Sequence, residues 1–565
     1  MARYAAFRRQ PVEQPYAQHL QTATIPAPMR GLVLNENESF MQPGGTLVHD
    51  NWFPTLQGVK LRGGCKRWCD LHALDTTVPP VPDASRLPVI SAFEYAYGNV
   101  QKMFAANSAK LFEVTTNTPV LIRSGHASGN YCAAQLANAS GSYLLVVNDA
   151  GDYVMRFDGT TWTTLNGGQF VAPPPPEFVG TWDQKGLTYV WKYRNRLFFI
   201  RGGTMEAWYL PLNAIQGQMH IIPLSGAAAR GGNLLFGATW SLDAGDGIDE
   251  KCCFFTDLGE VLIFTGTDPS DPNNWRQEGR YRVGPPLGMN AHFTLGGDLM
   301  ALTVDGIVPI SAAITKSSGQ LELAMITRTI EPLWHEEANA KRGWAWSAKV
   351  WDEYSGIFVS TPGDAIGKRH CLVANSTTGA WAKFTGYDAT CFIRMRGDMY
   401  FGTQDGLIQQ ADRTGFDDAR LMPDGITLTG TPYTATFVGG WEMFGSPSSE
   451  IVWHQARASF KTSATEPFVP QLTATVDYQI VVPPPPPPGP DPGPQTGWDE
   501  GLWDAARWDA PVTTILPVRN TGWVSIGMTG FAHAPILQVQ IAQQAKPAVE
   551  LISIAATYER AGVNV

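Results

Sequence analysis

The sequence contains no apolar stretch long enough to cross a membrane as a helix. No run approaches the roughly 18 apolar residues that such a helix needs, and the polar N-terminus, residues 1–18, has no apolar segment typical of a secretory signal. Cysteine is scarce too, with 7 scattered residues in 565, an odd number. We therefore expect free thiols in a chain that folds in a reducing cytosol.

Charge is low and acidic. Charged residues make up 16% of the chain, and the net charge is -10. General nucleic-acid binding needs clustered Lys and Arg that displace counterions, so the composition argues against it. An acidic net charge is still compatible with a channel wall along which DNA moves without binding.

Motifs for catalysis are missing as well. The sequence has no GxxxxGK phosphate loop, and Ser128 in GHASG stands one place late for a nucleophile elbow. His335-Glu336 is followed by Asn339 where a zinc-protease helix has its second histidine. We expect no catalytic residues, no cofactor and no enzymatic activity.

One cluster, Cys65, Cys69 and His72, places metal-ligand residue types close together. A structural zinc site needs a fourth ligand and commonly a second paired half. Neither follows nearby, so we expect no metal site.

What the sequence does contain is turn residues and aromatics: 57 Gly, 42 Pro and 19 Trp. This composition favours many turns joining short strands, and hence an all-β fold. The stretch 254–288 shows one hairpin most completely. Phe254 and Phe255 lead into Asp257-Leu258-Gly259, where glycine permits positive φ and the aspartate is expected to bond its own backbone. Residues 268–274 then end the outgoing strand.

Similar hairpins recur along the chain. Asp-Gly turns between apolar runs occur at Asp305 and Asp405. With looser copies, the turn centres fall at residues 108, 150, 195, 258, 305, 355 and 405, so the gaps are 42, 45, 63, 47, 50 and 50 residues. A period of roughly 40 to 50 residues is typical of β-propeller blades.

The sequence therefore predicts a β-propeller of six or seven blade-like units; a stack of β-sandwich domains is the main alternative. Tryptophans near the strand ends are expected to pack in the core between blades. They are Trp162, Trp191, Trp208, Trp346 and Trp381. The segment 333–344 is the best helical candidate, as a local insert.

Three regions follow from these patterns. We expect an N-terminal arm with platform strands over residues 1–84, the propeller over 85–415, and a C-terminal β platform domain over 416–565. The last includes an exposed proline-rich loop over 483–512, because consecutive prolines adopt an extended path without backbone donors. Trp498, Trp503 and Trp508 in that loop either pack back on the domain or anchor a partner.

Three pieces of the sequence resemble a known family. They are DNWFPTLQGVKLRGG (50–64), GEVLIFTGTDPSDPNNWRQEGRYRVGPPLG (259–288) and TTGAWAKFTGYDATCFIRMRGDMYFGTQDGLIQQAD (377–412). Together they resemble the tail nozzle, or tail tubular protein B-like, proteins of short-tailed bacteriophages. The likeness spans most of residues 50–412, and the second piece is the most specific.

The resemblance implies a structural protein of the virion tail, made in the host cytoplasm. Such proteins form a homohexameric tube below the head-to-tail adaptor ring, conduct double-stranded genomic DNA into the host at its outer surface, and support tail fibres or spikes. Two other functions stay open: a glycan-binding or glycan-degrading propeller, and a cytosolic propeller scaffold for protein partners.

Overall fold

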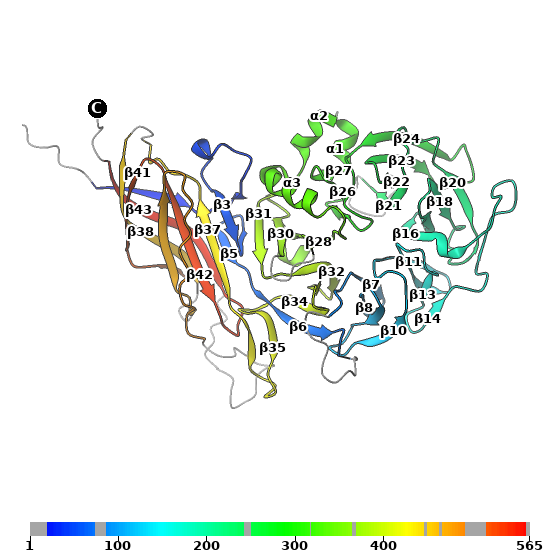
Figure 1. Ribbon diagram of the computed structural model, residues 1–565, viewed down its shortest axis with the longest axis horizontal. Coiled ribbons are helices and arrows are strands. Elements are labelled where there is room, and N and C mark those ends of the chain that lie inside the picture. Colours follow the sequence, from blue (N-terminus) through cyan, green and yellow to red (C-terminus); the bar gives the residue numbers. More distant parts are fainter. Residues whose placement is uncertain are drawn as a thin grey trace, which may run out of the picture.

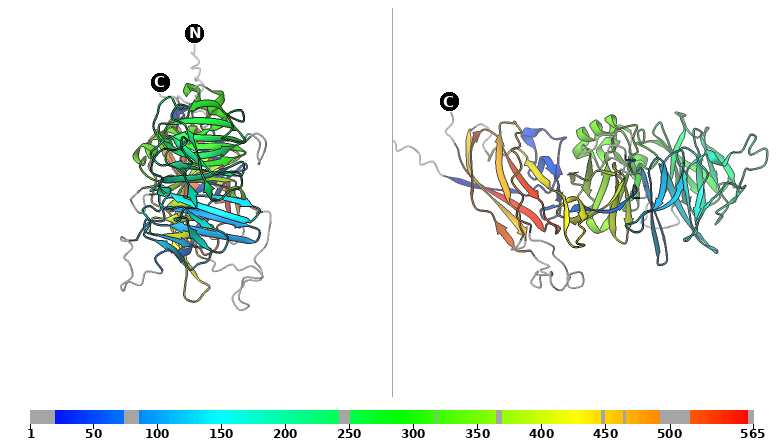
Figure 2. Two further views of the ribbon diagram at one scale, coloured as in Figure 1. Left: turned by 90° about the vertical axis from the view of Figure 1, so that its right-hand side faces the viewer. Right: turned by 60° about the horizontal axis from the view of Figure 1, so that its bottom comes forward.

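The computed structural model describes residues 20–73, 86–241, 250–316, 318–363, 369–445, 449–462, 466–491 and 516–560. It confirms the predicted fold class: the chain is all-β, with a β-propeller and an additional β-rich domain (Figure 1). The two parts lie side by side along the long axis of the molecule (Figure 2). Trp498, Trp503 and Trp508 lie outside the described residues.

Seven blades in the described part of the chain form the propeller, six with four strands and one with three; two of the four-stranded blades are parts of larger sheets. Given from the axis outward, the first two four-stranded blades are β7 (Ser91–Tyr97), β8 (Val100–Ala106), β9 (Lys110–Glu113) and β10 (Val120–Ser124), and then β11 (Tyr131–Asn138), β12 (Gly141–Asn148), β13 (Met155–Phe157) and β14 (Trp162–Thr164). The next two are β16 (Leu187–Tyr193), β17 (Arg196–Arg201), β18 (Glu206–Tyr209) and β20 (His220–Pro223), and then β21 (Leu234–Trp240), β22 (Lys251–Thr256), β23 (Glu260–Gly266) and β24 (Trp275–Arg282). The last two are β28 (Ala348–Trp351), β29 (Gly356–Ser360), β30 (His370–Asn375) and β31 (Trp381–Thr385), and then β32 (Ala389–Met395), β33 (Asp398–Thr403), β34 (Leu407–Thr414) and β6 (Gly64–Asp70). The three-stranded blade is β25 (His292–Leu295), β26 (Asp298–Leu302) and β27 (Ile307–Pro309).

The first strands of the blades close a ring around the axis. β7 contacts β11, β11 contacts β16, and β16 contacts β21. β21 contacts the three-stranded blade, whose β25 contacts β28; β28 contacts β32, and β32 returns to β7. Each blade therefore covers the face of its neighbour, and this stacking buries apolar side chains that a single small sheet leaves exposed.

The last blade is completed by a strand from the other end of the chain. β6 pairs antiparallel with β34, with Asp70 opposite Leu407 and Cys69 opposite Ile408. The expected propeller limits of 85–415 therefore omit one strand, because β6 lies within the expected arm of residues 1–84. Nothing local distinguishes β6 from a platform strand; its place depends on pairing across more than 330 residues.

Each of the seven predicted turns falls in a different blade. The turn at Asn195 joins the first two strands of its blade, whereas the turn at Leu258 joins the second and third strands of the next, which explains the long 63-residue gap. Gly259 has φ +82, as expected of the turn. One detail was wrong: Asp257 does not bond its own turn, because its carboxylate accepts hydrogen bonds from the backbone and side chain of Asn233.

The predicted core tryptophans are buried, except that Trp162 is half-buried. Trp191 shows how a blade fits its neighbour: its ring lies against Gly237 of the next blade, and a Cβ on that glycine would come within 2.4 Å of it. The ring also meets Phe254 edge-on at 5.6 Å. Such edge-to-face aromatic contacts are favourable.

Short elements accompany the blades. The predicted helix is confirmed as α3 (Glu331–Ala340), ending four residues earlier than expected. The others are α1 (Ile310–Thr315), α2 (Ser318–Leu321), the parallel pair β15 (Phe170–Val171) and β19 (Gly217–Gln218), and the 3-10 turns η1 (Glu38–Phe40), η3 (Gln184–Gly186), η4 (Glu322–Ala324), η5 (Arg328–Ile330) and η6 (Asp352–Tyr354).

The second domain, which we call the platform, is a sandwich of two sheets. One sheet contains β1 (Gln21–Pro26), β4 (Trp52–Pro54), β5 (Val59–Leu61), β43 (Val549–Arg560), β38 (Ile451–Thr462), β40 (Val518–Asn520) and β41 (Val524–Gly530). The other contains β2 (Gly31–Leu32), β3 (Gly45–Asp50), β37 (Tyr433–Gly439), β42 (His533–Ile541) and β39 (Pro470–Val476). Trp52, Phe437 and Trp453 pack between them.

The second platform sheet is continuous with a propeller blade. β31, the outer strand of its blade, pairs with β2 and β3, so one nine-stranded sheet runs from the propeller axis to the far side of the platform. The last blade continues in the same manner into the hairpin β35 (Asp417–Leu421) and β36 (Leu428–Thr431). Backbone hydrogen bonds therefore join the two domains.

A buried ion pair fastens the two places where the chain crosses between domains. Arg62 lies between β5 and β6, and Asp417 begins β35. Nη1 and Nη2 of Arg62 donate to the two carboxylate oxygens of Asp417, each at 2.7 Å. Nε donates to Asn51 Oδ1 at 2.7 Å, and the remaining hydrogens reach the carbonyls of Gly63 and Thr385 at 3.1 and 2.5 Å. All five N–H donors of the guanidinium are thus satisfied.

Aromatic rings and glycines surround the ion pair between Arg62 and Asp417. The guanidinium carbon lies 4.0 Å from the ring centre of Tyr433 and 4.6 Å from that of Tyr387. A Cβ on Gly386 would come 2.0 Å from Asp417 Oδ2, and one on Gly64 would come 1.9 Å from the carbonyl oxygen of Phe416. Only glycine allows these close approaches.

Removing Arg62 should destabilise the chain strongly. In Arg62→Met the carboxylate of Asp417 stays buried without its partner, so we expect the free energy of unfolding to fall by about 3–5 kcal/mol. Urea unfolding followed by tryptophan fluorescence measures it. The matched control is Arg67→Met on β6, since Arg67 pairs with the half-exposed Asp418, where the loss should stay below about 1 kcal/mol. Equal losses in the two variants would contradict this account.

Candidate functional site

A large cavity lies on the propeller axis. It has a volume of about 1340 Å³ and is lined by the first strands of all seven blades. Such a cavity exists because the ring of inner strands is wider than their side chains can fill. Pockets of several hundred to about 1,000 Å³ are common ligand sites, which makes this cavity the candidate site.

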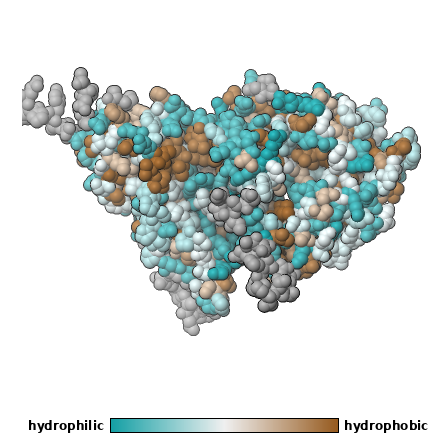
Figure 3. Space-filling view, viewed as in Figure 1, coloured by the Kyte–Doolittle hydropathy of each residue, from teal (hydrophilic) through white to brown (hydrophobic). Residues whose placement is uncertain are grey.

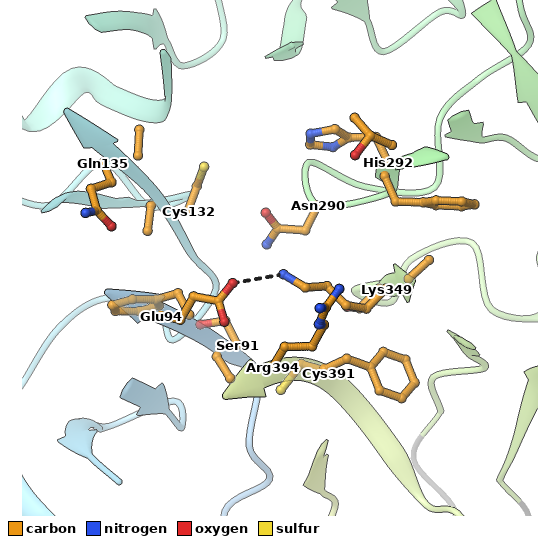
Figure 4. A pocket seen from close by; sticks show the side chains of 18 of the residues that line it. Ser91, Glu94, Cys132, Gln135, Asn290, His292, Lys349, Cys391 and Arg394 are labelled. Atoms are coloured by element: carbon orange, nitrogen blue, oxygen red, sulfur yellow. Dashed lines mark hydrogen bonds and ion pairs between the residues drawn. The ribbon is translucent and has the colours of Figure 1, made fainter. Parts of the chain in front are cut away.

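Charged side chains from different blades meet in the cavity (Figure 4). Glu94 of β7 points toward Lys349 of β28, with 3.5 Å between the carboxylate and Nζ. Arg394 of β32 donates to Asp352 at 2.6 Å and to the carbonyl of Val350 at 3.3 Å. The first contact links two blades that are not neighbours in the ring, and the second links two neighbouring blades.

The cavity lining is more basic than the chain as a whole. It includes five cationic residues, Lys102, Lys192, Lys349, Arg394 and Arg396, and three acidic ones, Glu94, Glu250 and Asp352. The whole chain, by contrast, carries a net charge of -10. The axis is therefore suited to polar or anionic small molecules.

The two thiols in the cavity are not activated as nucleophiles. Burial raises the pKa of both lining thiols, Cys132 and Cys391, to about 11, so they stay protonated at neutral pH and are poor nucleophiles. Glu94 and Asp352 each form an ion pair with a basic side chain. Amides such as Gln135 and Asn290 add hydrogen-bonding groups that suit binding (Figure 4).

His292 is a half-buried titratable ring at the cavity wall (Figure 4). It stacks on Phe236 with ring centres 4.8 Å apart, and its Nε2 lies 3.4 Å from the hydroxyl of Tyr189. Its Nδ1 is buried without a hydrogen-bond partner among the described residues. Burial lowers the pKa of His292 to about 4, so the ring is neutral at physiological pH.

Cys65, Cys69 and His72, the sequence cluster of metal-ligand residue types, do not form a common site. Cys65 and Cys69 are buried in two separate core clusters, and Nε2 of His72 accepts a hydrogen bond from the Leu87 backbone at 3.0 Å. The described residues contain no group of three His, Cys, Asp or Glu side chains placed to hold a metal ion. All seven cysteines are free and buried.

The other sequence candidates have structural roles. Ser128 accepts a hydrogen bond from the backbone of Asn130 in a loop, and Nε2 of His335 on α3 lies 3.1 Å from the carbonyl oxygen of Asp305. No helix in the described segments is long and apolar enough to cross a membrane.

The sequence did not single out the cavity residues. Glu94, Lys349 and Arg394 are isolated charges in three separate strands, with no motif around them. They meet only because the ring closes.

The low pKa of His292 predicts a pH-dependent stability. The pKa of this histidine is about 6.5 in the unfolded chain and about 4 in the folded chain. The neutral ring therefore contributes its full stabilisation of the folded state above about pH 6.5, and this stabilisation is lost as the pH falls toward 4. Between pH 7 and pH 5, wild type should lose about 1–2 kcal/mol more than His292→Phe. Urea unfolding at both pH values measures this. Phe104→Leu, a core change in another blade, should give a pH-independent loss; parallel curves for wild type and His292→Phe would refute the assignment.

Comparison with known proteins gives little beyond the architecture. No family model matches the sequence, and no curated protein matches it. Among solved structures, the extracellular domain assigned to a hybrid two-component system of B. thetaiotaomicron is 11% identical, with a TM-score of 0.37, over 67% of this chain and 42% of that protein. A β-propeller domain from Myceliophteria thermophila is 12% identical, with a TM-score of 0.36, over 58% of this chain and 96% of that domain.

This chain thus spans less than half of the first of these proteins. Likenesses at such identities and TM-scores carry no information on function. The assignment of the propeller rests on the chain's own strand order and on the closed ring of inner strands.

Proposed function

We propose that this protein is a subunit of the tail nozzle of a short-tailed bacteriophage. In this role it is a structural virion protein without enzymatic activity, assembled as a ring, expected to be a homohexamer, below the head-to-tail adaptor. The ring conducts genomic DNA during ejection and supports fibres or spikes. The proposal is founded on the three resembling sequence pieces, and the observation that carries it is the sheet shared by propeller and platform.

The shared sheet suits a mechanical role. Force applied to the platform reaches the propeller through backbone hydrogen bonds between β3 and β31, and through Arg62 and Asp417 at the chain crossings. Lys383 of β31 adds an ion pair to Asp50 of β3 at 3.2 Å. A subunit joined in this manner transmits load without a flexible hinge between its parts.

The DNA conduit in this proposal lies between subunits. One turn of duplex DNA, about 34 Å long, fills on the order of 10,000 Å³, whereas the cavity on the propeller axis holds about 1340 Å³. The cavity of a single propeller is therefore far too small to hold one turn of duplex DNA. A ring of acidic subunits would surround it with a wall that repels phosphates and lets it slide.

The platform offers surfaces for assembly. Within the described residues β1 pairs only with β43, so its other edge is open, and an open edge strand is a template for another chain. Figure 3 shows hydrophobic side chains gathered on the platform side of the face in view. Large exposed residues of the platform include Val518, Trp523 and Phe531, and exposed apolar patches mark interaction sites.

A second candidate function, glycan binding or degradation, is favoured by the central cavity. Its amides and ion pairs are groups that hold sugar hydroxyls, and its size admits an oligosaccharide. A cytosolic scaffold that binds protein partners, the third alternative, has no comparable supporting observation.

The nozzle proposal predicts rings. Purified protein examined by electron microscopy and by mass measurement should form closed rings of several subunits around a hole wide enough for duplex DNA, with the platforms in contact. A protein that stays monomeric at micromolar concentration would contradict the proposal. A monomer that also binds or cleaves a bacterial polysaccharide, and loses this on Glu94→Gln, would establish the glycan function instead.

A further inference from the structure

A run of prolines crosses the platform surface as an extended rod. Residues 480–490, IVVPPPPPPGP, follow β39 and form what we call the proline ridge. Each proline fixes φ near -65° and lacks an N–H, so six in succession adopt polyproline II geometry with three residues per turn. In the described chain the ridge belongs to no sheet.

Burial along the ridge repeats every three residues, as this geometry requires. Pro486 is buried, and Pro483 and Gly489, three positions before and after it, are half-buried. Pro484, Pro485, Pro487 and Pro488 are exposed. One of the three faces of the rod therefore packs on the platform, and the other two face solvent.

At Gly489 the proline ridge packs closely against the platform surface. A Cβ at this position would come 1.9 Å from the carbonyl oxygen of Pro467. The proline run is thus interrupted by glycine where the backbone lies directly against the carbonyl of Pro467.

Both ends of the ridge are held. Before it, the ring of Tyr478 packs against Trp441 at 5.0 Å, and the Tyr478 hydroxyl accepts a hydrogen bond from Ser39 at 2.9 Å. After it, Asp491 accepts hydrogen bonds from the backbone and side chain of Gln544, both at 3.3 Å. The ridge is therefore ordered before any partner arrives, which lowers the entropy cost of binding.

The exposed surface of the ridge is apolar throughout. Ile480, Val481 and Val482 are 44%, 69% and 41% exposed, and the outward prolines continue their row. Leaving such a row in water is unfavourable. No cationic residue lies between Asp477 and Asp491, so the ridge segment itself offers a partner no basic side chain.

The chemistry of the ridge selects its partner. A β-strand cannot pair with it, because prolines offer no backbone donors. Proline rods are bound by grooves whose walls are aromatic rings. The exposed aromatic residues on the described surface of this chain are Phe40, Tyr97, Trp344, Tyr478, Trp523 and Phe531, and none packs against another exposed ring. The described surface of a second copy therefore presents no such groove.

We propose that the proline ridge is a docking site for a different protein, one with a groove lined by aromatic side chains that reads proline rings without requiring a neighbouring charge. The two solvent-facing sides of the rod enter that groove. One side carries Pro484 and Pro487, and the other carries Pro485 and Pro488. This inference goes beyond the nozzle function, since it needs no ring and places the contact on one defined segment.

The test uses a purified WW domain that binds decaproline, titrated into the full-length chain in a calorimeter. The chain should bind it at least as tightly as a free peptide of residues 477–491, because the rod is already ordered. Pro484→Ala/Pro487→Ala, which clears one outward face, should weaken binding by about tenfold or more. The control Pro174→Ala changes an exposed proline in a turn and should have no effect.

Three results would overturn the proposal. The WW domain fails to bind the chain while it binds the peptide or decaproline; the double variant binds as well as wild type; or the double variant changes the subunit number by mass measurement, which would make the ridge a contact between copies. An unchanged urea midpoint of the double variant shows that its fold is intact. Failure here leaves ring formation by the unaltered chain, and hence the nozzle proposal, separately testable.

Discussion

The ion pair between Arg62 and Asp417 is the constraint on which the arrangement of the two domains depends. Both residues lie where the chain passes between platform and propeller, and both are buried. A buried charge is tolerable only when it is paired and hydrogen-bonded, and here all five guanidinium hydrogens find acceptors. The pair therefore permits one relative placement of the domains and penalises others.

The shared sheet follows from this placement of the two domains, and the proposed load-bearing role depends on that sheet. With the crossings fixed, β31 lies beside β2 and β3, and a propeller blade becomes part of the platform. A propeller alone suits many functions, since fold does not determine function. What distinguishes this chain is the attachment of its propeller, through a shared sheet, to a sandwich in which β1 has an open edge among the described residues, together with an axial cavity too small to hold a turn of duplex DNA.

Local signals in the sequence predicted local structure well. Turn residues such as Gly259 and Gly406 marked one hairpin in every blade, and the aromatic positions predicted core residues such as Trp208 and Trp381. These signals act over a few residues, where glycine conformation and strand alternation dominate. The helix at α3 was found for the same reason.

Features that depend on long-range pairing were not predictable. β6 looks like a platform strand until its pairing with β34 is known, and the RGG sequence at residues 62–64 does not reveal the partner of its arginine. Glu94 and Lys349 likewise meet only after the ring closes. Each pair is separated by more than 250 residues, beyond the reach of any local pattern.

The central claim is that platform and propeller behave as one body, and amide hydrogen exchange followed by mass spectrometry tests it most directly. The account predicts that peptides from β31 of the propeller and from β3 and β37 of the platform are protected alike and open together under mild denaturant. Platform peptides that exchange fully while β31 stays protected would contradict it.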